Sequence, residues 1–247
     1  PVAHRHFGSA GPGSSPAADA PIAPTRTPAD RRQLADDSRS LKTGDVIDHA
    51  ASALAGRTRI LGFTGAGIST ESGIPDFRGP HGMWKRVDPA DYTYDLYVND
   101  PEFRVNTWGK RFGSPLLGAQ PNRAQHAVSR RWASGRVVGC VTQNIDGLHA
   151  AAGLDPASLV ELHGNAHHIH CITCGDEPDF GEVEQRWESG TADPECLHCG
   201  GILKTKVVYF GEELPPHATR RAWEMAERAD AAIVIGSTLS VYPAAFV

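Results

Sequence analysis

Five short apolar segments, each followed directly by polar residues, constrain the fold of this chain more than any other feature. They occupy residues 59–64, 136–142, 159–162, 207–210 and 231–235, and helical patterns lie between several of them. Strands that alternate with helices form a parallel sheet with helices on both faces. We therefore predict an α/β fold, in which ligands bind at the carboxyl ends of the strands.

The rest of the chain divides into segments of different character. Residues 1–42 are rich in Ala, Pro, Gly and Ser and lack apolar periodicity, which is typical of a disordered tail. The periodicity predicts helices at about 45–55 and 217–229 and a mostly helical stretch at about 80–134. Residues 166–205 interrupt the alternation of strands and helices and are interpreted as a small inserted module.

These patterns predict four segments: a tail at 1–42, the first part of the sheet domain at 43–165, the inserted module at 166–205 and the second part of the sheet domain at 206–247. Residues 231–247 have the pattern of a strand, a turn and the beginning of another element. We therefore expect the fold to continue beyond Val247.

Charge and hydropathy argue against several classes of protein. The formal net charge is −5, which disfavours a broad basic surface for nucleic acid. No apolar run approaches the roughly 18 residues that a membrane span requires, and the N-terminus lacks the apolar region of a secretory signal. We expect a cytoplasmic protein that binds neither a membrane nor a specific nucleic acid.

Four of the five cysteines form two pairs with the spacing of a metal site. Cys171 and Cys174 make one C-x-x-C pair, and Cys196 and Cys199 make the other after 21 intervening residues. In an intracellular chain this pattern favours zinc over disulfides. Four thiolates complete a tetrahedral structural site with no open position for a catalytic water. Four unligated thiols are the alternative, and Cys140, alone in an apolar strand, is interpreted as a core residue.

A glycine-rich turn, Gly65-Ala66-Gly67, follows the first predicted strand. Glycines let backbone N–H groups approach a pyrophosphate, and a helix beginning near Ser69 adds its positive N-terminal dipole. An ordinary tight turn is the alternative. The acidic strand end about 20 residues later, which NAD oxidoreductases use to bind ribose, is absent. The turn therefore indicates a nucleotide site but not a hydride-transfer enzyme.

Two further polar segments have the composition of a nucleotide site. Asp76-Phe77-Arg78 supplies an arginine that can pair with phosphate and a ring that can exclude water; its alternative is a surface ion pair over a buried Phe. Gln143-Asn144-Ile145-Asp146 follows the second strand and can bind a carboxamide and ribose hydroxyls. Its alternative is a simple turn before Gly147.

A histidine at the end of the third strand, His163, is the candidate general base. Histidine titrates near neutral pH, so its neutral ring can accept a proton from a ribose hydroxyl. Histidines are more often structural, and the alternatives in this chain are His149, His167, His168 and His170.

Taken together and in this order, the motifs resemble those of the sirtuins, which are NAD-dependent protein lysine deacylases. The resemblance rests on GAGISTESGIPDFRG at 65–79, TQNIDGLH at 142–149, ELHGN at 161–165, the two C-x-x-C pairs, VVYFGEELP at 207–215 and GSTLSVYPA at 236–244. It covers residues 43–247. Each motif is moderately specific, and the ordered set is highly specific.

The resemblance implies a Rossmann-like sheet domain and a small zinc-ribbon and helical domain, with NAD and the acyl-lysine peptide between them. The loop at about 65–84 is implied to order over NAD, with Arg78 near the diphosphate and Phe77 covering the place where nicotinamide leaves. The implied catalytic residues are Asn144, Asp146 and the general base His163. The implied cofactor-binding residues are Gly65, Ala66, Gly67, Ser69, Thr70, Asp76, Phe77, Arg78, Gln143, Asn144, Ile145, Asp146, Gly236, Ser237 and Thr238.

The implied reaction consumes NAD. The acyl oxygen of the lysine attacks C1′ of the nicotinamide ribose, nicotinamide leaves and an alkylimidate forms. His163 then takes a proton from the ribose hydroxyls, so that the 2′-oxygen can attack the imidate carbon. The products are free lysine, nicotinamide and O-acyl-ADP-ribose. Mono-ADP-ribosyl transfer at the same NAD site is the alternative activity, and a zinc-ribbon interaction module is the non-enzymatic alternative.

Two positions bear on the choice of acyl group. Family members that prefer succinyl-lysine carry Tyr and Arg three residues apart, where this chain has Trp108 and Arg111. We expect mainly acetyl removal, with an acidic acyl group tolerated through Arg111, unless Arg111 faces solvent on a helix that Trp108 anchors. The other implied substrate-binding residues are Val208, Phe210 and Gly211. The expected partners are acyl-lysine proteins, and the oligomeric state is left open.

Overall fold

The computed structural model describes residues 43–247, so the predicted tail at 1–42 lies outside the described residues. The chain divides into two compact units between Ala53 and Leu54. Helix α2, Thr43–Leu54, confirms the helix predicted at 45–55, and its apolar residues Val46 and Ile47 are exposed. All candidate site residues belong to the second unit, Leu54–Val247.

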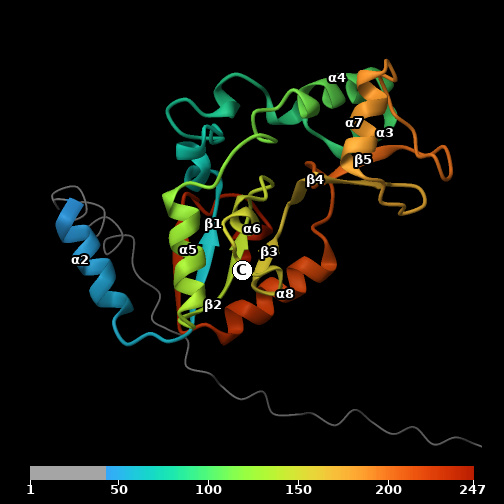
Figure 1. Cartoon of the computed structure of the whole chain (residues 1–247). Helices are drawn as coiled ribbons and strands as arrows, with labels where there is room; N and C mark the ends of the chain where they lie inside the picture. Colours follow the sequence, from blue (N-terminus) through green and yellow to red (C-terminus); the bar gives the residue numbers. More distant parts are fainter. Residues whose placement is uncertain (1–42) are drawn as a thin grey trace, which may run out of the picture. The chain divides into compact units, whose positions relative to one another are not determined.

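A four-stranded parallel sheet lies in the second unit (Figure 1). Thr64 pairs with Thr142 and Ile235, and Thr142 pairs with Glu161, so the four strands end at one common edge. The α/β class and four of the five predicted strands are confirmed. The strands are β1 (Ile60–Thr64), β2 (Val137–Thr142), β3 (Leu159–Glu161) and β6 (Ala231–Ile235), in the order β3-β2-β1-β6.

Helices of several lengths connect these strands. The α-helices of the second unit are α3 (Tyr94–Asn99), α4 (Pro101–Phe112), α5 (Arg123–Ala133), α6 (Leu148–Ala151), α7 (Phe180–Glu188) and α8 (Pro216–Arg228). The last of these confirms the helix predicted at 217–229. The short 3₁₀ helices are η1 (Ala66–Ser72), η2 (Met83–Lys85), η3 (Pro89–Asp91), η4 (Pro156–Ser158) and η5 (Ala244–Phe246).

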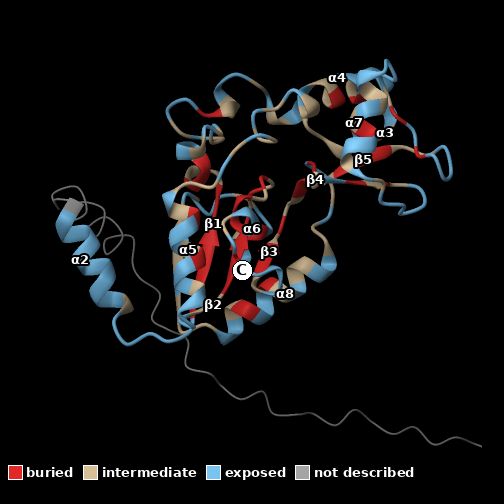
Figure 2. Ribbon diagram, in the orientation of Figure 1, coloured by how far each residue is buried: buried red, intermediate tan, exposed pale blue. Residues whose placement is uncertain are grey.

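The sheet is covered by a different helix on each face. Val141 shares one core with Met225 of α8, whereas Cys140, its neighbour in β2, packs with Trp132 of α5 on the opposite face. Successive residues of a strand point to opposite faces, which explains why adjacent residues enter different cores. Figure 2 shows the buried strands between α5 and α8. Cys140 is a fully buried core residue, as expected, and burial raises the pKa of its thiol to about 12.

The strand predicted at 207–210 as part of the parallel sheet is wrong. Strand β5 is Leu203–Val207, and it pairs antiparallel with β4, Gly164–Cys171, in a separate sheet. Phe210 makes only an isolated bridge with Thr93. The three polar residues at 204–206 hid this strand, because Lys204 is buried through an ion pair with Glu212 that sequence periodicity cannot reveal.

A second, smaller core joins α4 to the cysteine-bearing segment. Trp108 and Phe112 of α4 pack with Ile169, Leu203 and Val183. The stretch predicted to be mostly helical at about 80–134 therefore contributes to two cores: α4 packs in the small core, and α5 packs against the sheet. The fold class, a parallel sheet with helices on both faces plus a small cysteine-bearing and helical domain, is confirmed, and the four predicted segment boundaries stay predictions.

Within residues 43–247, none of the helices combines the length and the apolar character that crossing a membrane would require.

Candidate active site

The candidate site lies at the edge where the parallel strands end. Residues 65–70 follow β1, residues 143–146 follow β2, His163 comes two residues after β3 and residues 236–238 follow β6. The hydrogen bonds described below join these segments. The structure therefore brings together the main polar segments that the sequence placed at strand ends.

Glycines after β1 and β6 let two loops touch. The Gly67 N–H donates to the Gly236 carbonyl at 2.9 Å, and the Gly65 N–H donates to the Ile235 carbonyl at 3.0 Å. A Cβ at Gly67 would lie 2.8 Å from the Gly236 Cα, so a larger residue cannot fit without a shift of the main chain. The helix predicted to begin near Ser69 is instead the 3₁₀ helix η1, which begins at Ala66. These glycines thus fix the two loops to each other.

Ser69 is the centre of a buried hydrogen-bond network. Its hydroxyl donates to Asp146 Oδ2 at 2.6 Å and accepts from the Asn144 side-chain amide at 3.1 Å. The same amide also donates to the Gly65 carbonyl at 3.2 Å. Ser69, Asn144 and Asp146 are all buried. The network therefore joins the loop after β1 to the two predicted catalytic residues after β2.

Asp146 and Ile145 are also held by the main chain around them. Asp146 Oδ1 accepts from the Leu148 N–H at 3.0 Å, and the Asp146 carbonyl accepts from His167 Nε2 at 3.1 Å. The Ile145 carbonyl accepts from the Ala166 N–H at 2.8 Å. Both carboxylate oxygens of Asp146 are thereby fixed in direction.

His163 has a defined tautomer. Its Nδ1 lies 2.9 Å from the Gln143 carbonyl, and because a carbonyl only accepts, Nδ1 carries the proton. Nε2 is left with a lone pair, which is the form that a general base needs. Burial lowers the pKa of the His163 imidazole below its ordinary value, and the hydrogen bond to Gln143 offsets part of this effect. The ring is therefore neutral at pH 7.

Two of the alternative histidines have structural partners instead. His149 is buried beneath the sheet edge, with Nε2 2.8 Å from Thr64 Oγ1, and burial lowers its pKa. His167 donates to the Asp146 carbonyl, as described above. Neither ring follows a strand in the way that His163 does.

Gln143 keeps one hydrogen-bonding group unused. Its Oε1 accepts from the Ser237 hydroxyl at 2.8 Å, and its main-chain N–H donates to the Thr64 carbonyl at 2.9 Å. The side-chain nitrogen, Nε2, is buried and has no hydrogen-bond partner among the described residues. Buried polar groups are rarely left unpaired, so this donor fits a ligand that supplies an acceptor.

An aromatic group connects the loop after β1 to the segment after β5. Phe77 stacks on Trp84 with ring centroids 5.0 Å apart, and Trp84 lies 5.9 Å from Phe210. Asp76 turns the chain here by accepting from the Gly79 N–H at 2.9 Å. Arg78 is exposed. The alternative of a surface ion pair over a buried Phe is not what the described residues show, because Phe77 is a half-buried, stacked ring and Arg78 faces solvent.

The remaining predicted cofactor residues lie on the surface of the two loops. Thr70 is exposed and bonds the Gly67 carbonyl at 3.0 Å, and the Thr238 hydroxyl lies 2.7 Å from the Ser240 hydroxyl. Ala66 lies in η1 between the two glycines.

The predicted substrate-binding residues are only partly brought together. The Val208 N–H donates to the His163 carbonyl at 2.9 Å, which places Val208 beside the candidate base. Phe210 is exposed, and Gly211, with φ of 82°, has open space around its Cα. Trp108 is 1% exposed inside the small core, so the structure does not place it at an acyl-binding surface.

Arg111 is half-buried in the same helix as Trp108. Its Nε is buried without a partner among the described residues. Burial raises the pKa of the Tyr209 hydroxyl, and the nearby Arg111 guanidinium offsets part of this rise. The alternative in which Trp108 anchors the helix agrees with the burial of Trp108, whereas Arg111 itself is neither fully exposed nor fully buried.

Sequence reasoning missed two members of the network, Asn122 and Gln125. Gln125 donates to the Ser69 hydroxyl at 3.1 Å, and Asn122 donates to the Ile68 carbonyl at 2.8 Å. The available signal was the capping-box pattern Asn122-x-x-Gln125, which predicts the start of a helix but not its contact with a distant loop.

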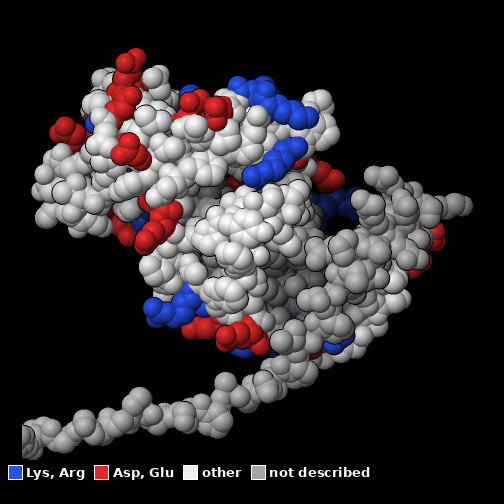
Figure 3. Space-filling view, turned by 180° about the vertical axis from the view of Figure 1, so that it is seen from behind, with Lys and Arg blue, Asp and Glu red and all other residues white. Residues whose placement is uncertain are grey.

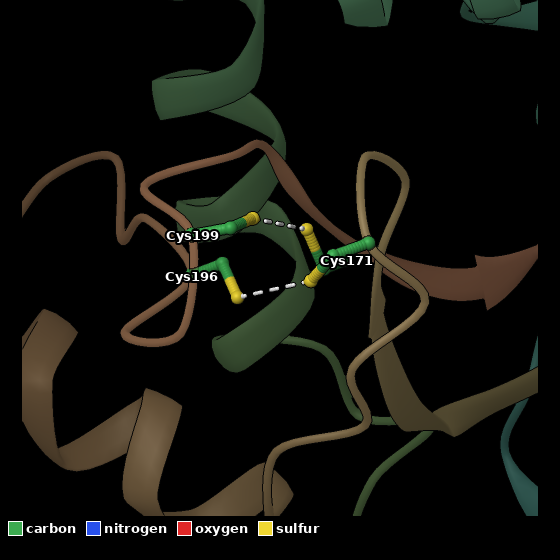
Figure 4. Close-up of side chains that lie close together, drawn as sticks. Cys171, Cys196 and Cys199 are labelled. Atoms are coloured by element: carbon green, nitrogen blue, oxygen red, sulfur yellow. Dashed lines mark hydrogen bonds between the residues drawn. The ribbon is translucent and has the colours of Figure 1, made fainter.

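The four paired cysteines form a cluster whose geometry fits zinc. Their sulfurs all lie within 4.8 Å of one another, with Cys171 and Cys199 at 3.5 Å and Cys174 and Cys196 at 3.8 Å. Zn–S bonds of about 2.3 Å in a regular tetrahedron place sulfurs about 3.8 Å apart. Figure 4 shows Cys196 and Cys199 facing Cys171 across the site. Zinc bound here is structural, because four thiolates leave no open position.

A hollow of about 650 Å³ lies beside the candidate active site, between β3, β5 and α8. Of the predicted site residues only Val208 lines it. The hydrogen-bond network, rather than this hollow, therefore marks the candidate active site.

Comparison with known proteins identifies the family. The model of the Sir2 family matches residues 65–243. The NAD-dependent protein deacetylase 2 of Streptomyces coelicolor is 42% identical over 194 residues, which cover 78% of this chain and 80% of the relative. The chain belongs to the Sir2 family. Another relative, the NAD-dependent protein deacetylase of Caldivirga maquilingensis, is 44% identical over 198 residues, covering 80% of this chain and 75% of the relative.

Solved Sir2 structures share the fold. A Sir2 complex with a p53 peptide and NAD⁺ matches with a TM-score of 0.70 and 36% identity, covering 83% of this chain and 80% of that one. A Sir2 variant with a deacetylated p53 peptide and 3′-O-acetyl ADP-ribose matches with a TM-score of 0.73 and 36% identity, covering 81% and 79%.

These findings confirm the activity that the resemblance implied. This Sir2 protein is an NAD-dependent protein lysine deacylase, which releases nicotinamide and O-acyl-ADP-ribose. NAD is its co-substrate, and the cysteine cluster fits its structural zinc.

Proposed function

We propose that this Sir2 protein acts mainly on acetyl-lysine, with His163 as its general base. The observation that carries the proposal is the His163 tautomer, in which the Gln143 carbonyl fixes the proton on Nδ1 and leaves Nε2 free. A neutral ring with a lone pair near the strand edge can accept a proton from a ribose hydroxyl. The Gln143 carbonyl then stabilises the imidazolium that forms, because Nδ1–H still donates to it.

NAD supplies the ADP-ribose group that accepts the acyl group. Asn144 and Asp146 orient the nicotinamide ribose and carboxamide, and their fixed directions in the Ser69 network support this role. The unpaired Gln143 amide donates to the same part of NAD. The other cofactor-binding residues in this proposal are Gly65, Ala66, Gly67, Ser69, Thr70, Asp76, Phe77, Arg78, Ile145, Gly236, Ser237 and Thr238.

The acyl-lysine side chain enters beside Val208 and Phe210 in this proposal. The Val208 N–H donates to the His163 carbonyl, and Phe210 and Phe77 both contact the ring of Trp84. An apolar wall next to the base excludes water from the reacting groups. Gly211 follows this wall, and a Cβ added there would meet no atom within 4 Å, which supports placing the peptide main chain beside it.

Arg111 gives this Sir2 protein a limited tolerance for acidic acyl groups. Its unpaired Nε is a donor that a carboxylate can satisfy, which supports the proposal. Trp108 is buried in the small core and supplies no hydroxyl to the acyl group. A succinyl group therefore meets one of the two partners that succinyl-preferring relatives offer, and acetyl remains the preferred substrate.

The partners in this proposal are acyl-lysine proteins in the cytoplasm. On the face shown in Figure 3, basic and acidic side chains form small separate groups among uncharged residues. This distribution supports recognition of protein segments over recognition of nucleic acid on that face.

A panel of acyl-lysine peptides tests the proposal. Each peptide is incubated with the protein and NAD labelled in the ADP-ribose part, and nicotinamide release and peptide mass are followed. The acetyl peptide is expected to lose its acyl group fastest, with the label on the released acyl product. Label that stays on protein or peptide would establish mono-ADP-ribosyl transfer instead.

A further inference from the structure

The N-terminus of α5 reaches into the candidate active site through one side chain. Gln125, in the first turn of α5, is fully buried, with 0% of its surface exposed. Its side-chain nitrogen donates to the Ser69 hydroxyl at 3.1 Å. A helix that packs on one face of the sheet thus contacts the network at the strand edge.

The orientation of the Gln125 amide is fixed by the helix itself. Its Oε1 accepts from the Asn122 N–H at 2.9 Å, as part of a capping box. Because the oxygen is engaged there, the NH₂ group must point at Ser69. The Asn122 side chain binds the same loop a second time, donating to the Ile68 carbonyl at 2.8 Å and to the Ser72 hydroxyl at 3.1 Å.

This contact determines where the Ser69 proton points. The Ser69 oxygen accepts from Gln125 and from Asn144, so both of its lone pairs are used. Its only proton is therefore directed to Asp146, at 2.6 Å. Without Gln125 the Ser69 oxygen loses one of the two donors that fix the rotation of its hydroxyl, so the link between Asn144 and Asp146 is held less firmly.

We propose that Gln125 is a positioning residue for NAD, acting through Ser69 on Asn144 and Asp146. The proposal rests on the roles of Asn144 and Asp146 in binding NAD given above. It differs from a purely structural account, in which Gln125 only caps α5 and its loss lowers stability without changing how the folded enzyme binds NAD.

Two substitutions separate these accounts. Gln125→Met keeps the length of the side chain but removes the donor, so KM for NAD should rise about tenfold while kcat changes about twofold or less. Gln125→His returns a ring N–H donor and should bring KM back to within about threefold of wild type. Loss of folded enzyme alone lowers kcat and leaves KM unchanged.

Ser129→Ala is the matched control. Ser129 lies one turn further along the same helix, is buried like Gln125 and is outside the network. Its variant should keep the wild-type KM for NAD. In Gln125→Met, kcat/KM for NAD should fall by the same factor for nicotinamide exchange and for deacetylation, since both reactions need correctly bound NAD.

A double-mutant cycle with Ser69→Ala completes the test, measured on kcat/KM for NAD in the full chain. If Gln125 acts through Ser69, Gln125→Met should have almost no further effect in the Ser69→Ala background. Equal effects in both backgrounds, or a wild-type KM in Gln125→Met, would overturn the proposal. If the Met variant does not fold, Gln125→Asn replaces it, because its amide is too short to reach Ser69. Wild-type enzyme without NAD-dependent deacetylation would instead contradict the proposed function.

Discussion

At the residue scale, the site depends on the positions of two protons. The proton on His163 Nδ1 is fixed by the Gln143 carbonyl, and the proton of Ser69 is fixed by the two amides that bond to its oxygen. One choice leaves Nε2 free to act as a base. The other directs a hydroxyl at Asp146, so the proposal assigns acid–base chemistry and ligand positioning to different side chains.

Replacing His163 with alanine should separate the two halves of the reaction. Deacetylation should fall by about 10²-fold or more, the usual contribution of a general base. Nicotinamide exchange should fall much less, because the base acts after nicotinamide leaves. Both rates are measured with the same acetyl peptide, and His168→Ala, which alters an exposed ring, is the control. Equal losses in both reactions would remove His163 from the role of base.

The pH dependence of deacetylation should follow the shifted titration of His163. Only the neutral ring accepts a proton, so kcat/KM falls as pH drops through the pKa of this residue. Because burial lowers that pKa, the acid limb should lie below pH of about 6.5, the ordinary value for histidine. A pH–rate profile between 4.5 and 8 with one acetyl peptide is the measurement, with the range chosen to bracket the ordinary titration of about 6.5. An acid limb above that value would contradict the neutral, half-buried ring.

At the element scale, most strands could be predicted from the sequence, but the contacts between loops could not. Strands β1 and β2 are apolar throughout because both faces of the sheet are covered, and this made them visible. Strand β5 was misplaced because the charge of buried Lys204 is compensated by Glu212, eight residues away. The bond from Gln125 to Ser69 spans 56 residues, and no local pattern encodes such a contact.

The close contact between the loops after β1 and β6 should make Gly67→Ala destabilising. Its new Cβ would lie 2.8 Å from the Gly236 Cα and 3.0 Å from the Gly236 carbonyl oxygen. Both are main-chain atoms, which cannot move aside locally. Overpacking of this kind lowers the free energy of unfolding by about 1–3 kcal/mol. Urea denaturation provides the measurement, and Gly118→Ala, with open space around its Cα, is the control. Equal stability of the two variants would contradict the packing described.

Removal of zinc should unfold the small core but leave the sheet. Cys171 and Cys196 pack in the same core as Trp108, so loss of the metal removes support from α4 as well. Cys174→Ala should bind no zinc and lose the near-UV circular dichroism of the small core, because structural metal binding provides folding free energy. Cys140→Ala, a cysteine outside the cluster, should still bind one zinc per chain. A folded, active Cys174→Ala protein without zinc would contradict a structural role.

At the scale of the whole molecule, two cores are joined in one enzyme. The sheet core presents the edge that carries the candidate site, and the small core holds α4, which carries Arg111. The burial of Trp108 in this core agrees with the alternative in which Trp108 anchors the helix, whereas its partners at residues 169–203 could not be predicted from the sequence. In the proposal, the choice of acyl group depends on how the small core presents the Arg111 guanidinium.

Arg111→Met should change the acyl preference. A carboxylate that accepts hydrogen bonds from the half-buried guanidinium gains about 1.5–3 kcal/mol, so kcat/KM for a succinyl peptide should fall at least about tenfold. The value for the acetyl peptide should stay nearly unchanged. Lys110→Met removes a neighbouring exposed charge from the same helix and controls for net charge. Equal effects of Arg111→Met on both peptides would mean that Arg111 does not contact the acyl group.

The central claim is that this Sir2 protein transfers an acyl group from lysine to ADP-ribose with His163 as the base. The most direct measurement is mass spectrometry of all products from one acetyl-lysine peptide and NAD, for wild type and His163→Ala. Wild type should form free lysine peptide, nicotinamide and O-acetyl-ADP-ribose in equal amounts, and His163→Ala should form almost none of the deacetylated peptide. Free acetate, ADP-ribose attached to protein, or unchanged deacetylation by His163→Ala would contradict the claim.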